Sequence, residues 1–318
     1  MPGRRPADRP DRNNRIRRST RGGEQEMKAQ YRWLPWVFLA PALAIALIFH
    51  IGPFLNTLVL SFTDATTLGG GTFTGVENYA ALLSDPQFWT SVRNTLLYAV
   101  VVVPLLMLLP LLLAVLVEKN LPGIGFFRSV FYSPVVASMV VVGLIWTWLL
   151  SSDGAVNRVL QALRIVQEPL PFLTDTSLLL FSCMLVTVWK GLGYYMVIYL
   201  AALGNVPQHL HEAAQVDGAG GARRFWSITL PGVRSTMFLV GLLGAIASMK
   251  VFAEIFVISS GTAGPGGQAR TLVYTIREVG LGLSGEIGYA SAMSLALFVL
   301  TIGFSILYLR SQRMEQTR

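Results

Sequence analysis

Cysteine and charge are both scarce in this sequence. Among its 318 residues there is one cysteine, Cys183, which excludes an intramolecular disulfide and any cysteine-based metal site. Charged residues make up 13% of the chain, against roughly 25% in a typical soluble domain, and hydrophobic residues make up 53%. This composition excludes an ordinary soluble protein and indicates an integral membrane protein.

Signatures of catalysis are also missing. The sequence contains no G-x-x-x-x-G-K-[ST] phosphate loop, so we expect any ATP energy to come from another chain. The three histidines, His50, His209 and His211, lack the accompanying carboxylates of a metal site, and no nucleophile–base set is visible. We therefore expect no enzyme activity, no cofactor and no metal.

Six apolar blocks dominate the rest of the chain. Each is long enough to cross a hydrocarbon core of about 30 Å, which takes about 20 helical residues. The blocks are 34–61, 95–117, 129–150, 178–201, 236–258 and 287–309. They predict an all-α integral membrane protein with one six-span domain over residues 33–310.

Positive charge predicts the orientation of these spans. Ten of the 25 Lys and Arg residues lie in 1–32, which we expect to be a disordered cytoplasmic tail. With that tail inside, 18 of the 25 fall in inside segments and five in outside segments, while Lys190 and Lys250 lie within spans. The positive-inside rule thus favours both termini in the cytoplasm, with 311–318 as a short second tail. A basic tail in front of a span favours contact with the lipid bilayer, and we expect no nucleic-acid partner.

A polar stretch rich in alanine and glycine separates the fourth and fifth blocks, at 205–232. Asn205 is a suitable N-cap and Pro207 is tolerated in a first turn, so a helix is predicted to start there. Glycines from Gly218 onward predict its end and a chain reversal, and a second short helix is expected to run to Pro231. On these features alone, a docking helix and a plain connector between spans stay equally open.

The string EAAQVDGAGGARRFWSITLP within this stretch resembles the EAA signature of membrane subunits of binding-protein-dependent ABC importers. The residues that fill the signature are Glu212, Ala213, Ala214, Asp217, Gly218, Ala219, Phe225, Ile228, Leu230 and Pro231. The likeness covers nearly the whole chain. Segments 73–95 and 121–150 are similar to maltose-type sugar permeases, whereas 260–265 departs from the Thr-x-Gly-Gly-Pro pattern of that family.

The resemblance implies a fold and a set of partners. The fold is a six-transmembrane-helix ABC importer permease bundle with a cytoplasmic coupling helix, in a bacterial inner membrane. The partners are a second homologous permease, two cytoplasmic ATP-binding subunits and an extracytoplasmic solute-binding protein. In that family the EAA loop sits on the ATPase, so the resemblance implies that 205–232 couples ATP hydrolysis to transport. It also implies a sugar or sugar-like cargo, with oligosaccharides, monosaccharides, polyols and glycerol phosphate all open.

Charged and aromatic residues inside the spans are candidates for the solute path, because a charge at mid-helix costs about 2.5–3.5 kcal/mol on insertion scales. Trp189, Lys190 and Tyr194 offer flat rings and a hydrogen-bond donor, which suit a sugar. The alternatives are that Lys190 snorkels to the interface or pairs with a partner subunit. Lys250 and Glu254, four residues apart, would share one helix face. They would either line the path or neutralise each other as a simple ion pair.

Two other function classes can be compared with this prediction. An ion-coupled secondary transporter would place ionisable residues at the bilayer midplane among inverted repeats, and Lys190 alone gives that class little support. A membrane-embedded enzyme would need an acid–base or metal set inside the spans. The sequence therefore predicts a transporter subunit of the ABC permease kind.

Overall fold

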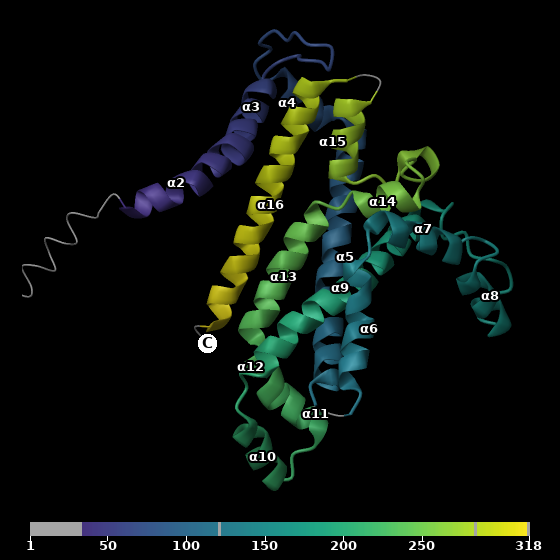
Figure 1. Cartoon of the computed structure of the whole chain (residues 1–318). Helices are drawn as coiled ribbons and strands as arrows, with labels where there is room; N and C mark the ends of the chain where they lie inside the picture. The colour runs from purple at the N-terminus through teal and green to yellow at the C-terminus, as the bar shows by residue number, and fades with distance from the viewer. Residues whose placement is uncertain (1–33, 120–121, 283–284, 317–318) are drawn as a thin grey trace, which may run out of the picture. The chain divides into compact units, whose positions relative to one another are not determined.

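The computed structural model describes residues 34–119, 122–282 and 285–316 (Figure 1). Over these residues the chain is helical apart from turns, loops and two isolated β-bridges. It divides into two compact units, 1–56 and 57–318, which are described separately. The predicted basic tail, 1–32, lies outside the described residues.

In the first unit, α2 (Leu34–Ala46) leads into a π-helical turn (Leu47–Ile51) and then into α3 (Gly52–Leu60). The N–H of Gly52 bonds to the carbonyl of Leu47, five residues back. Pro53 follows immediately and has no N–H for an α-helical bond, which accounts for the wider turn before it.

The described part of the structure has four to six candidate membrane spans, against the six predicted. Four described helices are long and apolar enough to cross a membrane, and two bent helix pairs raise the total to as many as six. The four are Trp36–Leu60, α5 (Pro86–Val117), α9 (Thr176–Leu203) and the first part of α16 (Ile287–Gln316).

Aspartate caps decide where two of these helices begin. Asp85 Oδ1 accepts a bond from the N–H of Gln87 at 2.8 Å, so α5 starts at Pro86, well before the predicted residue 95. Asp175 Oδ1 likewise accepts from the N–H of Leu178 at 2.9 Å at the start of α9. A helix continues beyond its apolar core to its cap, which hydropathy alone does not mark.

The span predicted over 129–150 is not a single helix. The segment is a pair, α6 (Ile124–Val136) and α7 (Met139–Leu149), bent by 100°. Pro134 lacks the N–H that would continue the α6 ladder, and the hydroxyl of Ser138 caps the new helix by accepting from Val140 N–H at 3.3 Å.

The prediction of one helix over 236–258 is wrong. Helix α13 (Arg234–Met249) ends, and α14 (Ala253–Ile258) begins after a short non-helical break. The hydroxyl of Thr271 donates to the carbonyl of Val251 at 2.8 Å, which satisfies a backbone group that the break leaves open. A residue twenty positions away thus stabilises the break, and local sequence could not reveal it.

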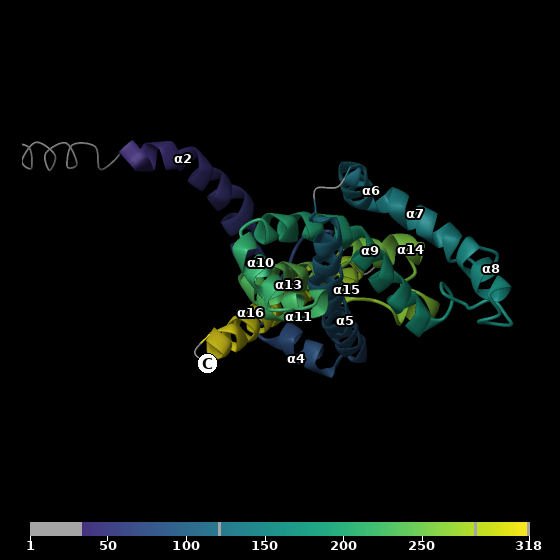
Figure 2. The same ribbon diagram turned by 90° about the horizontal axis from the view of Figure 1, so that it is seen from below.

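Shorter helices complete the second unit. They are α4 (Glu77–Ser84), α8 (Ala155–Ala162), α10 (Gln208–Val216), α11 (Gly221–Arg224), α12 (Leu230–Gly232) and α15 (Leu272–Leu281). Figure 2 shows α6, α7 and α8 in a row that leads away from α5 and α9.

The core of the second unit lies where α5, α9 and α13 pack against one another (Figures 1 and 2). Two fully buried tyrosines cross between these helices: Tyr98 donates to the carbonyl of Cys183 at 3.0 Å, and Tyr199 to that of Met107 at 2.9 Å. A buried hydroxyl needs such a partner, so these bonds fix how α5 faces α9.

Candidate functional site

Residues 205–232, here called the hairpin, form two short helical arms. The first arm is α10, and the second runs from α11 through a π-helical turn (Phe225–Thr229) into α12. The two arms meet at a tight glycine turn, and the second continues into α13 with a bend of 69° (Figure 1). The predicted pair of helices is therefore present.

Gly218 makes the turn between the arms. Its φ is +78°, and the N–H groups of Gly218 and Ala219 bond back to Gln215 at 3.1 Å and Ala214 at 2.8 Å. This is the Schellman arrangement, in which glycine adopts the left-handed backbone without the penalty of a Cβ. The predicted helix end at Gly218 is confirmed.

Two finer predictions for the hairpin are wrong. Asn205 does not cap α10, which starts at Gln208; its side-chain amide donates to the carbonyl of Ala201 at 3.1 Å. Pro231 does not end the second arm, which continues to Gly232. Proline lies in the first turn of α12, where its missing N–H is not needed.

The signature residues fall on two sides of the hairpin. Glu212, Ala213, Asp217, Gly218 and Pro231 are exposed, whereas Ala214, Ala219, Phe225, Ile228 and Leu230 are partly buried. Phe225 and Leu230 pack on the core of the second unit, so one side of the hairpin is anchored to the helices. The opposite side is available for a partner.

That opposite side combines charge with uncovered apolar area. Glu212 is held by Gln208, whose Nε2 donates to its carboxylate at 2.9 Å. Val216 is 87% exposed and Trp226 is 66% exposed. Exposed apolar side chains around a glycine turn are typical of a docking surface.

A groove of about 800 Å³ lies behind the hairpin, where it meets the ends of α5 and α9. Its lining includes Glu118, His211 and Arg224. Arg224 also donates from Nη1 to Gln215 Oε1 at 3.4 Å, a bond between the two arms. The hairpin is thus braced internally by polar contacts and rests on the spans through apolar ones.

Lys190 has a structural partner at the bend of the third span. Its Nζ donates to the carbonyl of Ala137 at 2.9 Å and to that of Val135 at 3.4 Å. These carbonyls lie at the end of α6, where the ladder is interrupted. The Trp189 ring packs edge-on against Trp146 at 5.5 Å, and Tyr194 packs in the same way against Tyr195 at 5.1 Å between ring centres.

A second cavity, of about 450 Å³, opens at the break between α13 and α14. Its polar lining consists of Tyr98, Thr187, Ser248, Lys250 and Glu254. The buried Ser248 hydroxyl has no hydrogen-bond partner among the residues that the structure describes. Of the five candidate path residues, Lys250 and Glu254 line this cavity, and Trp189, Lys190 and Tyr194 do not.

The expectation that Lys250 and Glu254 share one helix face is wrong, because the break separates them onto α13's end and α14. The two described side chains form no ion pair with each other. The cavity is therefore lined by an amine and a carboxyl group that form no ion pair with each other.

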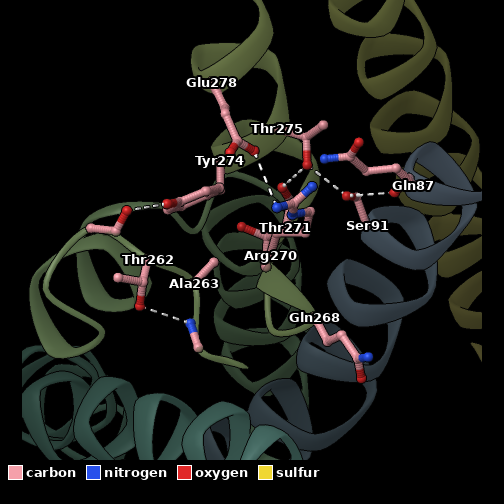
Figure 3. Close-up of polar contacts among 12 residues, drawn as sticks. Gln87, Ser91, Thr262, Ala263, Gln268, Arg270, Thr271, Tyr274, Thr275 and Glu278 are labelled. Carbon is pink, nitrogen blue, oxygen red and sulfur yellow. Dashed lines mark hydrogen bonds and ion pairs between the residues drawn. The ribbon is translucent and has the colours of Figure 1, made fainter. Parts of the chain in front are cut away.

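A polar cluster that the sequence did not predict lies beside the cavity, in residues 259–286 and the facing part of α5 (Figure 3). Helix α15 occupies part of it and bonds to α5 through Ser91 and Thr275, whose hydroxyls are 2.6 Å apart. Arg270 Nη2 lies 3.5 Å from the carboxylate of Glu278. The apolar spacing of Leu272, Ile276 and Val279 in the sequence could have predicted the helix.

Tyr274 and Arg277 fasten α15 to the wall of the cavity. The Tyr274 hydroxyl donates to the carbonyl of Gly261 at 2.6 Å, and burial raises the pKa of this hydroxyl, so it stays protonated as a donor. The Arg277 guanidinium lies 4.7 Å from the ring centre of Phe256 and 5.5 Å from that of Phe252, a cation–π contact. Phe252 itself lines the cavity.

Known transport proteins are similar to this chain in sequence and in fold. Residues 79–315 match the family described as "Binding-protein-dependent transport system inner membrane component". The chain is 31% identical over 293 residues to the lactose transport system permease protein LacF of Rhizobium radiobacter, covering 90% of this chain and 97% of that protein. It is also 31% identical to the trehalose/maltose transport system permease protein MalF of Thermococcus litoralis, covering 91% and 97%.

Among solved structures, a chain of the bacterial alginate ABC transporter in complex with alginate pentasaccharide-bound periplasmic protein superposes with a TM-score of 0.77. The match covers 91% of this chain and 96% of the other, at 22% identity. At this identity the likeness demonstrates a shared fold.

Proposed function

The chain belongs to the family of binding-protein-dependent transport system inner membrane components, and we propose that within such an importer it conducts a sugar. We also propose that the hairpin transmits the energy of ATP hydrolysis to the spans. It is a permease subunit of an ABC importer, a multi-pass protein of the inner membrane and a non-catalytic component. The observation that carries the proposal is the hairpin itself: a glycine turn with exposed apolar and acidic side chains, joined directly to α13.

We place the hairpin and both termini in the cytoplasm. Support comes from the distribution of Lys and Arg along the chain, which favours that side by the positive-inside rule. From there α10 would dock onto one of two ATP-hydrolysing subunits, with Glu212, Ala213 and Asp217 on the exposed side. A second homologous permease and an extracytoplasmic solute-binding protein complete the proposed assembly.

The cavity at the α13–α14 break is the proposed solute site. Its volume, about 450 Å³, falls in the roughly 300–1,000 Å³ range of small-molecule pockets. Ser248, Lys250 and Glu254 supply a hydroxyl, an ammonium and a carboxylate, and Phe252 supplies a ring face. A sugar, with hydroxyls around apolar ring faces, suits this combination. The permeases for lactose and for trehalose/maltose among the relatives support the same cargo class.

Two substitutions test the coupling role. Gly218→Pro forces φ to about −65°, which the +78° turn cannot accept, and Glu212→Lys reverses the charge on the exposed side. We expect uptake to fall by a factor of about 5–150, the range of a coupling free energy of about 1–3 kcal/mol, while ATP hydrolysis persists. Uptake of labelled sugar and phosphate release in reconstituted vesicles provide the two readouts.

Gly220→Ala is the matched control for these variants. Gly220 has an ordinary φ of −65°, and a Cβ there would meet no atom within 4 Å. We expect its uptake and ATP hydrolysis to stay at the level of the unmodified protein. Normal uptake by both Gly218→Pro and Glu212→Lys at normal membrane levels would show that the hairpin is only a connector.

A further inference from the structure

Helix α8 (Ala155–Ala162) has a mixed inward side, on which Asn157 is buried and Val156, Leu160 and Gln161 are partly buried. It follows α7 after a short turn, and both views place it at the outer end of the α6–α7–α8 row (Figures 1 and 2). Asn157 is fully buried. Its amide donates to the carbonyls of Ser151 at 3.0 Å and Leu170 at 3.1 Å and accepts from the Leu170 N–H at 2.9 Å.

The outer side of α8 and the residues just after it carry exposed apolar side chains. Val159 is 55% exposed, and Leu163 and Ile165, which follow the helix, are each 65% exposed. Val156 and Leu160 face inward and are partly buried, as in an amphipathic helix packed on a protein. The exposed apolar side chains form a second group on the outer side, which indicates that an apolar environment covers it.

The end of α8 has an arginine at a position where glycine would adopt the backbone conformation with less strain. Arg164 has a φ of +56°, and the N–H groups of Arg164 and Ile165 bond back to Gln161 and Leu160, each at 2.9 Å. This is the Schellman arrangement with arginine in the left-handed position, where a Cβ is penalised. Arg158, six residues earlier, is also exposed. Two cations therefore border the exposed apolar residues.

The outer side of α8 continues an apolar surface of the neighbouring helix. On α7, Val141, Leu144 and Ile145 are each more than half exposed, and Trp148 near its end is 69% exposed. In an inner membrane protein, hydrocarbon covers such a helix surface, and tryptophan favours its boundary with the headgroups. Only a short turn separates this boundary from the start of α8.

We propose that α8 lies in the membrane interface, with Val159, Leu163 and Ile165 among lipid acyl chains and Arg158 and Arg164 on the phosphates of anionic lipids. Amphipathic helices with apolar and basic residues bind membranes by burying the apolar side chains and by attracting anionic headgroups to the basic ones. The helix would thereby anchor the bent α6–α7 pair at the bilayer surface, a role beyond conduction and coupling.

Spin labels on single introduced cysteines test the depth of α8. The labels are placed by Val159→Cys and Leu163→Cys in a cysteine-free complex carrying Cys183→Ala, purified with its partner subunits into nanodiscs containing anionic lipid. Asp153→Cys, at an exposed polar position just before α8, is the matched control. We expect oxygen to collide with the Val159 and Leu163 labels severalfold more often than a water-soluble nickel complex, and the reverse order at Asp153.

Two results would overturn the proposal. Nickel access at Val159 as high as at Asp153 would place the apolar side in water. A label at Val159 that is immobile and shielded from both reagents would mean that a protein partner covers it.

The contact between the two arginines and lipid phosphate is tested separately. With Arg158→Gln and Arg164→Gln combined, or with discs of zwitterionic lipid only, the oxygen-to-nickel ratio at Val159 is expected to fall severalfold. A ratio that ignores both changes would show that the two arginines bind no lipid phosphate.

Discussion

Lys190 shows how one buried charge can be tolerated in a span. A mid-helix lysine is costly in hydrocarbon, about 2.5–3.5 kcal/mol on insertion scales. Here its ammonium binds the carbonyls of Val135 and Ala137, which the bend between α6 and α7 leaves without helical partners. The ammonium group and the two free carbonyls therefore satisfy each other's hydrogen bonding. This contact holds the fourth span against the third.

Lys250 provides the contrast, since it lies at the cavity and is exposed. We expect Lys190→Met to reduce stability by about 1–3 kcal/mol, because two backbone acceptors lose a charged donor. Lys250→Met should leave stability unchanged and raise the KM for sugar uptake. Unfolding of the purified protein and uptake kinetics, measured on both variants, check this pair. An unchanged stability of Lys190→Met together with a raised KM would instead place Lys190 in the solute path.

At the scale of elements, glycine controls how closely α6 and α9 approach. A Cβ at Gly193 would lie 2.2 Å from the carbonyl oxygen of Phe131 and 2.7 Å from the Cα of Tyr132. Both are backbone atoms that cannot move aside. Gly193 is therefore required for the packing that brings Lys190 to the end of α6.

Gly193→Ala should accordingly separate the two helices and destabilise the protein by about 1–3 kcal/mol, as overpacking in a core does. Gly191→Ala is the matched control one half-turn away, since its Cβ would meet mainly the flexible Leu106 side chain, at 2.7 Å. Thermal unfolding in detergent measures both. Equal stability of the two variants would contradict the close-packing account of Gly193.

The elements also show what the sequence could predict. Long apolar runs predicted the candidate spans, and Gly218 predicted the turn of the hairpin, because both signals are local. The bend after Val136 also had local signals, Pro134 and Ser138, but hydropathy does not weigh them. The break at Val251 was missed because a distant side chain, Thr271, binds the freed carbonyl. Hydropathy measures only whether a segment prefers hydrocarbon and says nothing about its straightness.

The difference between local and distant signals also decides which residues of the candidate site could be predicted. The hairpin residues were named from a contiguous string, which the structure keeps together in the two arms of the hairpin. The cavity was named only in part, because Tyr98, Thr187 and Ser248 come from three helices and carry no common motif. Lys250 and Glu254 were predicted as a pair on one helix face. In the structure they lie on either side of the break, and both line the cavity for that reason.

At the scale of the second unit, α13 connects the hairpin and the cavity, the two regions with a proposed function. It begins one residue after the hairpin's second arm and ends at Met249, next to the cavity residue Lys250. Its 16 residues span roughly 24 Å at 1.5 Å per residue. A shift of the hairpin would therefore tilt α13 and change the cavity, while Thr271 and α15 hold the far side of the break. Partner closure could then shift the population between two states of the cavity.

Photo-crosslinking from Val216 tests the central claim most directly. This side chain is 87% exposed on the hairpin, so a photo-reactive residue in its place should not disturb the fold. In the membrane-embedded complex, we predict a covalent product with an ATP-hydrolysing subunit, in a yield that changes when nucleotide is added. Absence of any such product, or labelling of a cysteine at the same position by an impermeant reagent added outside the cell, would contradict the account.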